Sequence, residues 1–199
     1  MNKQQQKTRQ RGRWKLLLVL AVCATPLIGS YLAYYVIKPA GRTNYGALID
    51  PRNYPVPAAL DATTLDGKPA ALDAYKGKWI MLQSGPAACP EACQKQLFTM
   101  RQLRLMQGKE RERVERVWLI TDAGPLDTLL MREFDGTRLL RASAAALAAW
   151  LPVEAGATAA DYLYLIDPLG NLMMRFPKDA DPAKVNKDIN KLLKASAIG

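Results

Sequence analysis

The chain has 199 residues, enough for one domain and an appended segment, and it contains no histidine. Without imidazole, a Ser-His-Asp triad and any histidine metal ligand are excluded, and the sequence carries no hydrolase or transferase signature. The formal net charge is +10, but six of the 28 basic residues precede residue 16 and 18 acidic residues nearly offset the others, so we expect no nucleic-acid partner.

The first predicted elements are a basic tail and a membrane anchor. Residues 16–37, "LLLVLAVCATPLIGSYLAYYVI", carry no charge. As a helix they would extend about 33 Å, enough to cross the hydrocarbon core of a membrane. We predict an uncleaved anchor, with a cleaved signal peptide as the alternative, and no chemistry for Cys23 inside it. The tail, residues 1–15, contributes Lys3, Lys7, Arg9, Arg11, Arg13 and Lys15.

A linker and one domain are predicted to follow the anchor. Residues 38–60 contain four prolines and two glycines, which interrupt any helical or strand period, so this segment is the expected linker. Residues 61–199 are the expected domain. It begins with a short hairpin, because Asp66-Gly67 is a strong turn dipeptide between two weakly alternating runs.

A buried strand, a pair of cysteines and a helix come next. Residues 78–84, "KWIMLQS", form an apolar run of strand length. The segment "PAACPEACQKQ" then places Cys89 and Cys93 four positions apart. An amphipathic helix follows them, because apolar residues recur at helical spacing, at Leu97, Met100, Leu103 and Met106.

The rest of the domain is predicted to hold a second buried strand, a helical middle, a hairpin and a last helix. The strand is "VERVWLITD", residues 114–122, and the hairpin is "DYLYLIDPLGNLMMRF". Asp181 is the expected N-cap of the last helix, with Pro182 at its first position. This order of elements is that of an α/β, thioredoxin-like domain, in which reactive cysteines lie where the first strand gives way to the first helix.

The sequence resembles the Sco/SenC family of membrane-anchored copper chaperones for cytochrome c oxidase assembly. The resemblance rests on "YKGKWIMLQSGPAACPEAC", "VWLITD" and "YLYLIDPLGNLMMRF" in that order, and it covers roughly residues 60–194. It implies a thioredoxin-like fold and a role for the cysteines in handling copper.

The chain also departs from the pattern of that family. Copper-binding members carry a histidine shortly before the hairpin as a third ligand, and that place falls near Ala159 here. The proline that usually follows the second cysteine is Gln94. The resemblance therefore implies the fold in full but the copper chemistry only in part.

The two cysteines leave three chemical possibilities open: a structural disulfide, a redox couple or a metal site. Pro90 fits the first helical position, which would place Cys89 at the helix N-terminus, where a thiolate is favoured, and so make Cys89 the more reactive thiol. Residues four apart on a regular helix are too far apart for a disulfide, so Cys89 must lie outside the helix for one to close. If the reduced pair binds metal, the soft ion Cu(I) is the expected one.

Three functions are consistent with these features. The first is a Sco-like assembly factor, in which Cys89 and Cys93 handle Cu(I) or keep a partner's copper-site thiols reduced. The second is a general exported thiol–disulfide oxidoreductase, and the third is a docking module that a disulfide merely stabilises. The expected partners are the membrane and a respiratory oxidase subunit or another exported thiol protein.

The basic tail predicts the topology. Because cytoplasmic flanks are rich in Lys and Arg, we expect a bacterial-type inner-membrane protein with a cytoplasmic N-terminus and a periplasmic domain. A reporter fused after residue 60 should be active only if it functions outside the cytoplasm. Activity of a reporter that works only in the cytoplasm would contradict this topology.

Overall fold

The structure, a computed structural model, describes residues 3–37, 43–57 and 60–198. The chain divides into two compact units, Met1–Thr43 and Asn44–Gly199. The first unit holds the N-terminal helix and the second holds the domain with the cysteine pair. Each unit is described by itself below.

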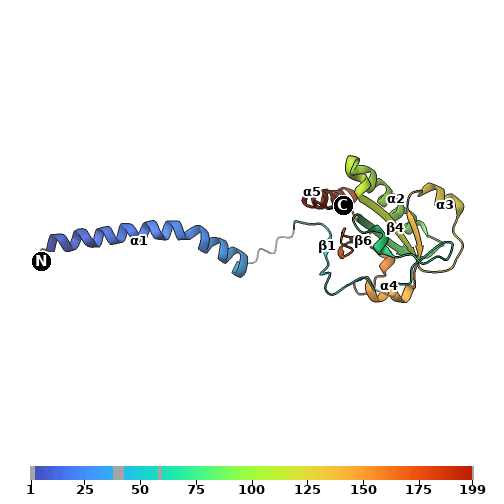
Figure 1. Cartoon of the computed structure of the whole chain (residues 1–199), viewed down its shortest axis with the longest axis horizontal. Coiled ribbons are helices and arrows are strands. Elements are labelled where there is room, and N and C mark those ends of the chain that lie inside the picture. Colours follow the sequence, from blue (N-terminus) through green and yellow to red (C-terminus); the bar gives the residue numbers. More distant parts are fainter. Residues whose placement is uncertain (1–2, 38–42, 58–59, 199) are drawn as a thin grey trace. The chain divides into compact units, whose positions relative to one another are not determined.

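The N-terminal unit is a single long helix. Helix α1 (Lys3–Tyr31) continues into a π-helical segment, η1 (Leu32–Ile37) (Figure 1). Its part Arg13–Ile37 is the one helix among the described residues that is long and apolar enough to cross a membrane. Residues 3–15 of the predicted tail are helical and form the start of α1, and residues 1–2 lie outside the described residues.

The domain is built on a seven-stranded mixed sheet with the strand order β1-β7-β6-β3-β4-β5-β2. Strand β3 lies in the middle, parallel to β4 and antiparallel to β6, and all its residues are buried. The predicted buried strands 78–84 and 114–122 are β3 and β4, and the predicted hairpin is β6 with β7. The strands are β1 (Ala47–Leu48), β2 (Thr63–Thr64), β3 (Trp79–Gly85), β4 (Val114–Ile120), β5 (Arg138–Arg141), β6 (Leu163–Ile166) and β7 (Leu172–Phe176).

Helices cover both faces of this sheet (Figure 1). Helices α2, α3 and α5 pack on one face, while α4 and η2 pack on the other. The last helix begins as predicted, with the Asp181 side chain accepting from the Ala183 amide and Pro182 in the first turn. The helices are η2 (Leu72–Tyr75), α2 (Glu91–Met106), η3 (Gly108–Arg113), α3 (Thr128–Glu133), α4 (Ala144–Trp150), η4 (Ala159–Asp161) and α5 (Pro182–Ala195).

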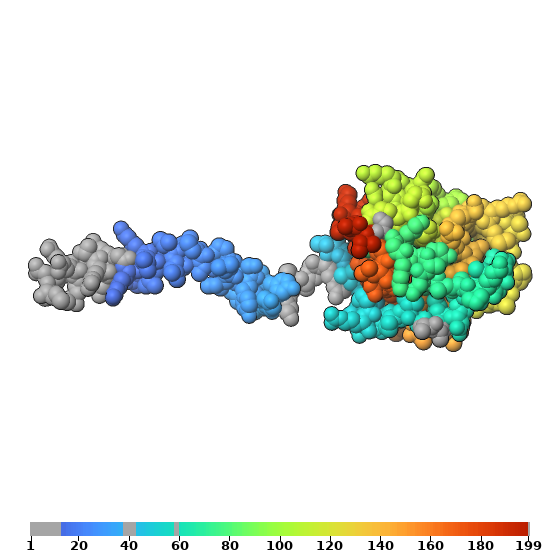
Figure 2. Space-filling view, viewed as in Figure 1, coloured from blue at the N-terminus to red at the C-terminus, as the bar shows by residue number. Residues whose placement is uncertain are grey.

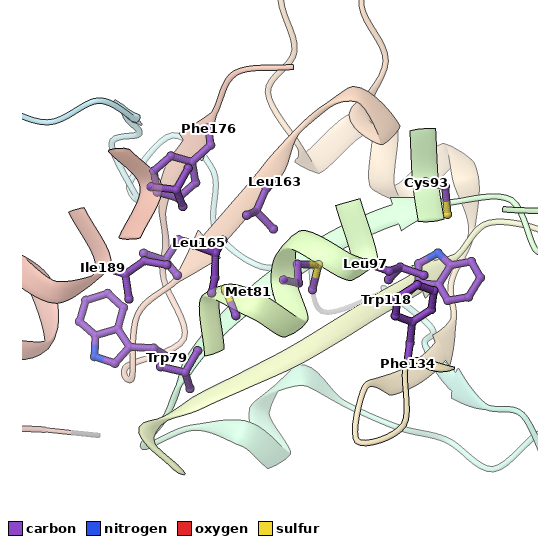
Figure 3. Close-up of a cluster of buried hydrophobic side chains, with 14 of the residues drawn as sticks. Trp79, Met81, Cys93, Leu97, Trp118, Phe134, Leu163, Leu165, Phe176 and Ile189 are labelled. Atoms are coloured by element: carbon purple, nitrogen blue, oxygen red, sulfur yellow. The ribbon is translucent and has the colours of Figure 1, made fainter. Parts of the chain in front are cut away.

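The core consists of two layers separated by the sheet. Side chains alternate along a strand, so Trp79 and Met81 of β3 face α2 and α5, whereas Ile80 and Leu82 face α4. Figure 3 shows the first layer, which runs from Trp79 at one end to Cys93 at the other. The cysteine pair is therefore part of a hydrophobic core.

Two features of the sheet differ from the prediction. Strand β5 lies in the segment that was predicted to be helical. Its sequence "RLLR" has an arginine at each end and only two apolar residues, so it shows no apolar run of strand length. The predicted hairpin at Asp66-Gly67 is reduced to a turn, with a single bridge between Thr63 and Pro69. The two-residue strand β2 pairs instead with β5 at the sheet edge.

Part of the predicted linker belongs to the domain. Strand β1 pairs with β7, and the buried Asp188 carboxylate accepts from the amides of Tyr45 and Gly46 at 2.7 and 3.0 Å. A Cβ on Gly46 would come within 2.5 Å of Met174 Sδ, so only glycine fits this approach. Figure 2 shows this segment, in cyan, on the domain surface. Residues 38–42 and 58–59 of the predicted linker lie outside the described residues.

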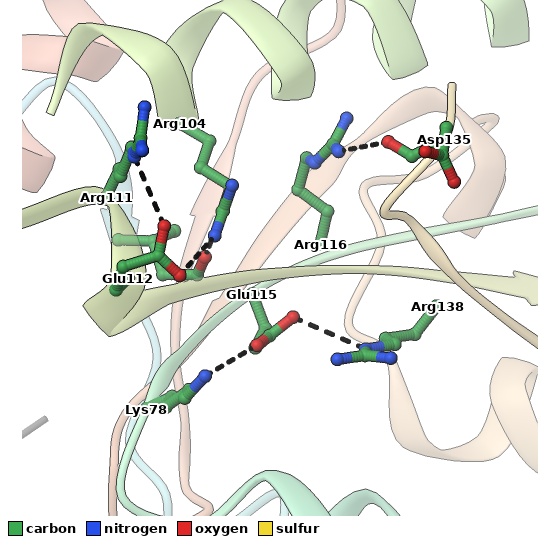
Figure 4. A network of polar contacts seen from close by, with 9 residues as sticks. Lys78, Arg104, Arg111, Glu112, Glu115, Arg116, Asp135 and Arg138 are labelled. Atoms are coloured by element: carbon green, nitrogen blue, oxygen red, sulfur yellow. Dashed lines mark hydrogen bonds and ion pairs between the residues drawn. The ribbon is translucent and has the colours of Figure 1, made fainter. Parts of the chain in front are cut away.

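A buried carboxylate on the α4 side of the sheet joins β4 to β5 and to the residue that precedes β3. Glu115 of β4 accepts from the Lys78 amine at 2.7 Å and lies 3.5 Å from the Arg138 guanidinium (Figure 4). Burial raises the pKa of Glu115, but the Lys78 hydrogen bond and the surrounding positive charges outweigh burial, so its pKa lies below the ordinary value of 4.5. The ionised form of Glu115 therefore stabilises the fold.

This carboxylate predicts an acid-dependent loss of stability. A lowered native pKa gives stability that is present above pH 4.5, the ordinary value, and is lost as the pH falls through the lower native pKa. At pH 7, Glu115→Gln should reduce the free energy of unfolding of the Asn44–Gly199 unit by about 1–2 kcal/mol, measured by urea unfolding. The difference from the natural chain should shrink below pH 4.5.

The matched control is Asp66→Asn in the exposed turn, which should change the free energy of unfolding by less than about 0.5 kcal/mol. A difference between Glu115→Gln and the natural chain that stays constant from pH 7 to pH 3 would contradict the assignment.

Candidate functional site

A disulfide lies between the central strand and the first helix of the domain. Cys89 and Cys93 are bonded, with their Cα atoms 5.1 Å apart. Strand β3 ends at Gly85 and α2 begins at Glu91, so Cys89 lies in the connecting loop and Cys93 in the first helical turn. The structure thus brings together the two residues that the sequence singled out. Their redox or metal-binding role remains a prediction.

The loop conformation explains how a pair four residues apart can close. Pro90 is the N-cap of α2 and not its first helical residue. The helix therefore begins one residue later than predicted. Cys89 has φ of +37°, in the left-handed region that residues with a side chain rarely adopt. The sequence required Cys89 to lie outside the regular helix, and this requirement is met.

Both cysteines are covered in the disulfide form. Cys89 is fully buried and Cys93 is 7% exposed. The order of exposure is thus opposite to the order of reactivity expected from the helix N-terminus. An incoming thiol must therefore displace part of the loop before it can reach Cys89, whose greater reactivity remains a prediction for the reduced form.

Two side chains that the sequence did not place at the site hold the cysteine loop. The Asp122 carboxylate, just after β4, accepts from the amides of Ala87 and Gly124. The Gln94 amide donates to the Cys89 carbonyl at 3.0 Å. Gln94, recognised in the sequence only as a departure from the Sco/SenC pattern, is therefore a loop-fixing residue.

Two buried side chains with polar atoms, Gln83 and Trp118, lie on β3 and β4 near the start of α2. The Gln83 amide nitrogen donates to the Cys93 carbonyl at 3.3 Å, and Gln83 is adjacent to Trp118 in the β3–β4 register. Both residues are buried, yet Gln83 Oε1 and Trp118 Nε1 have no hydrogen-bond partner. The sequence marks Gln83 only as a polar residue in a mainly apolar strand, and this pattern did not identify it as a site residue.

The two cysteine sulfurs are the candidate metal ligands at this site. The part of the chain that the structure describes contains no cluster of three His, Cys, Asp or Glu side chains that could hold a metal ion. The place of the family histidine falls in η4, next to the end of β3, where a Cβ on Gly85 would contact the Ala160 methyl at 3.9 Å. Two thiolates fit Cu(I), whereas Cu(II) prefers nitrogen ligands in a tetragonal set of four.

A small hollow lies beside Ala92, the residue that precedes Cys93. It has a volume of about 90 Å³ and is bounded by α2, η4 and the loop after β7. Lys178 and Asp161 form an ion pair of 2.8 Å at this hollow. The hydrogen bond from Lys178, followed by those from Thr158, lowers the pKa of Asp161 to about 2, so this rim stays charged at neutral pH.

Comparison with known proteins gives two family matches. Residues 79–196 match the model of a transmembrane-like, thioredoxin-like, C-terminal domain. Residues 6–36 match the model of a transmembrane-like, N-terminal domain. Comparison with curated protein sequences gave no match.

Among solved structures, the domain is similar to three Sco proteins. Yeast Sco1 with copper bound is 13% identical, with a TM-score of 0.54 over 79% of this chain and 97% of that chain. A SCO1/SenC family lipoprotein from Bacillus anthracis is 20% identical, with a TM-score of 0.54 over 73% of this chain and 99% of that chain. Arabidopsis thaliana ScoI with copper bound is 19% identical, with a TM-score of 0.52 over 76% of this chain and 99% of that chain.

These similarities confirm the predicted fold. The domain is thioredoxin-like, and the resemblance to the Sco/SenC family seen in the sequence extends to the tertiary structure. Two of the three similar proteins bind copper, according to the descriptions of their structures. At 13–20% identity the similarity establishes the fold and not the ligand.

Proposed function

This chain belongs to the family of proteins with a transmembrane-like N-terminal domain and a thioredoxin-like C-terminal domain, and we propose that it assists assembly of the copper site of cytochrome c oxidase. In this proposal α1 anchors the protein in a bacterial-type inner membrane, with the domain on the periplasmic side. Cys89 and Cys93 carry the chemistry.

The observation that carries the proposal is the position of the disulfide. It closes the loop between the central strand β3 and helix α2, and the Gln94 and Asp122 side chains fix that loop. Peptide N–H groups at the start of α2 favour a thiolate nearby.

The proposed reaction is the reduction of a partner's disulfide. A thiolate of the reduced pair attacks one sulfur of the partner, forming a mixed disulfide and releasing the other partner sulfur as a thiolate, which takes up a proton. The second cysteine of the pair, after losing its proton, attacks its neighbour's sulfur and releases the partner's second thiolate. Two electrons pass to the partner, which leaves with both thiols, and the Cys89–Cys93 disulfide seen here is the product.

Copper is the second proposed substrate, as cargo. The reduced pair offers two soft sulfur ligands to Cu(I), which is content with few ligands. Ala159 and Ala160 stand in η4, where copper-binding members of the resembled family carry a histidine. The chain contains no histidine, so it has no imidazole with which to hold Cu(II). A general exported thiol–disulfide oxidoreductase is the alternative function, favoured by this missing ligand.

The ligand set predicts a preference between the two copper ions. The reduced domain should bind one Cu(I) through Cys89 and Cys93 and should not bind Cu(II) stoichiometrically. Titration with each ion, beside a Cys89→Ser, Cys93→Ser double variant, measures this preference. A Cu(II) complex with a strong thiolate charge-transfer band would refute the ligand argument, and Cu(I) binding by the double variant would place the site elsewhere.

The function itself is tested in cells of the natural host. Replacing both Cys89 and Cys93 by serine should lower the copper content and activity of cytochrome c oxidase while leaving the amount of anchored protein unchanged. Cys23→Ser is the matched control, because Cys23 lies in α1 outside the domain, and it should have no effect. Normal copper content with the double serine variant would rule out the proposed function.

A further inference from the structure

Two buried atoms near the start of α2, one on Gln83 and one on Trp118, lack a hydrogen-bond partner and are complementary in kind. Gln83 Oε1 is a hydrogen-bond acceptor and Trp118 Nε1 is a donor, and the two residues are neighbours on β3 and β4. Gln83 is completely buried and Trp118 is 1% exposed. A buried polar atom without a partner costs about 1–3 kcal/mol, so two such atoms at one place need an explanation.

The Gln83 amide lies against the backbone of Cys93, and Trp118 is its neighbour on β4. The Cys93 carbonyl can only accept a hydrogen bond, which fixes the Gln83 amide with Nε2 toward that carbonyl and leaves Oε1 at the same end of the side chain. Figure 3 shows the Cys93 sulfur on the side of Trp118 that carries the ring nitrogen. Cys89 and Cys93 belong to the same core layer as Trp118.

The redox state of Cys93 decides what these atoms can bond. A disulfide sulfur has no proton to donate, so Gln83 Oε1 has no donor there in the oxidised form. A thiol has one weak donor and one weak acceptor. Reduction adds two electrons and two protons to the Cys89–Cys93 bond, and one of the protons goes to the Cys93 sulfur.

We propose that Gln83 and Trp118 are positioning residues that hold the reduced Cys93 thiol: its S–H donates to Gln83 Oε1, and its sulfur accepts from Trp118 Nε1–H. This inference rests on the proposed thiol–disulfide function. Reduction supplies the donor that Gln83 Oε1 lacks, and it releases the Cys93 sulfur from Cys89 so that this sulfur can turn toward Trp118 Nε1–H. Both bonds favour the reduced form without a charged group. The nearby Asp122 carboxylate is already bonded to the Ala87 and Gly124 amides.

The test measures the equilibrium of the disulfide with glutathione. The full chain in detergent, carrying Cys23→Ser, is equilibrated in buffers of defined reduced and oxidised glutathione and trapped by alkylation. Trp118→Phe removes the N–H, and Gln83→Met removes the amide. Each should lower the equilibrium constant for reduction about threefold to tenfold, the worth of one hydrogen bond.

Trp79→Phe is the matched control. Trp79 is buried in the same core layer and its Nε1 also lacks a partner, but it lies at the opposite end of β3 from the cysteines. It should leave the constant unchanged. Thermal unfolding of both redox forms is the second readout, because Trp118→Phe should destabilise the reduced form more than the oxidised form, whereas a purely structural effect would lower both equally.

The outcomes separate this inference from the proposed function. If the natural disulfide is reversible but Trp118→Phe and Gln83→Met leave its constant within twofold, the two atoms are satisfied alike in both states, for example by a buried water, and the inference is wrong. A change in only one variant overturns the joint arrangement. If the natural disulfide cannot be reduced reversibly by glutathione or a stronger dithiol, the proposed function fails and the inference with it.

Discussion

The parallel pairing of β3 with β4 is the constraint on which the site depends. It places Gln83 beside Trp118 and brings the end of β3, where the cysteine loop starts, next to Asp122. Because β3 is buried on both faces, neither strand can shift without exposing a core layer. The position of the disulfide follows from this register, since α2 must begin where β3 leaves the sheet.

The absence of histidine shapes the chemistry of this site. The side chains that bond the cysteine carbonyls are the amides of Gln83 and Gln94, and the Trp118 indole lies in the same core layer; none of these groups changes its charge at physiological pH. The one carboxylate that touches the loop, Asp122, bonds backbone amides. Neutral hydrogen-bonding partners of this kind suit the proposed thiol exchange or Cu(I) binding better than Cu(II) binding.

The segment Tyr45–Leu48, which lies in the predicted linker, is also part of the domain. Tyr45 and Gly46 are tied to Asp188 of α5 by a buried carboxylate, and β1 extends the sheet beside β7. The segment that connects the two units is thus shorter than the composition of residues 38–60 suggests. Prolines and glycines indicate irregular backbone, but they do not reveal whether that backbone packs against a fold.

The sequence by itself determined the apolar helix, the order of most strands and helices, and the cysteine pair at the junction of strand and helix. These features follow from charge, apolar runs and cap residues such as Asp181, all of which are local along the chain. Only the tertiary structure decided strand β5, the left-handed backbone of Cys89, the burial of both sulfurs and the pairing of Gln83 with Trp118. Each depends on residues distant in sequence, as does the Tyr45 bond to Asp188 across 143 positions, and no local pattern encodes such contacts.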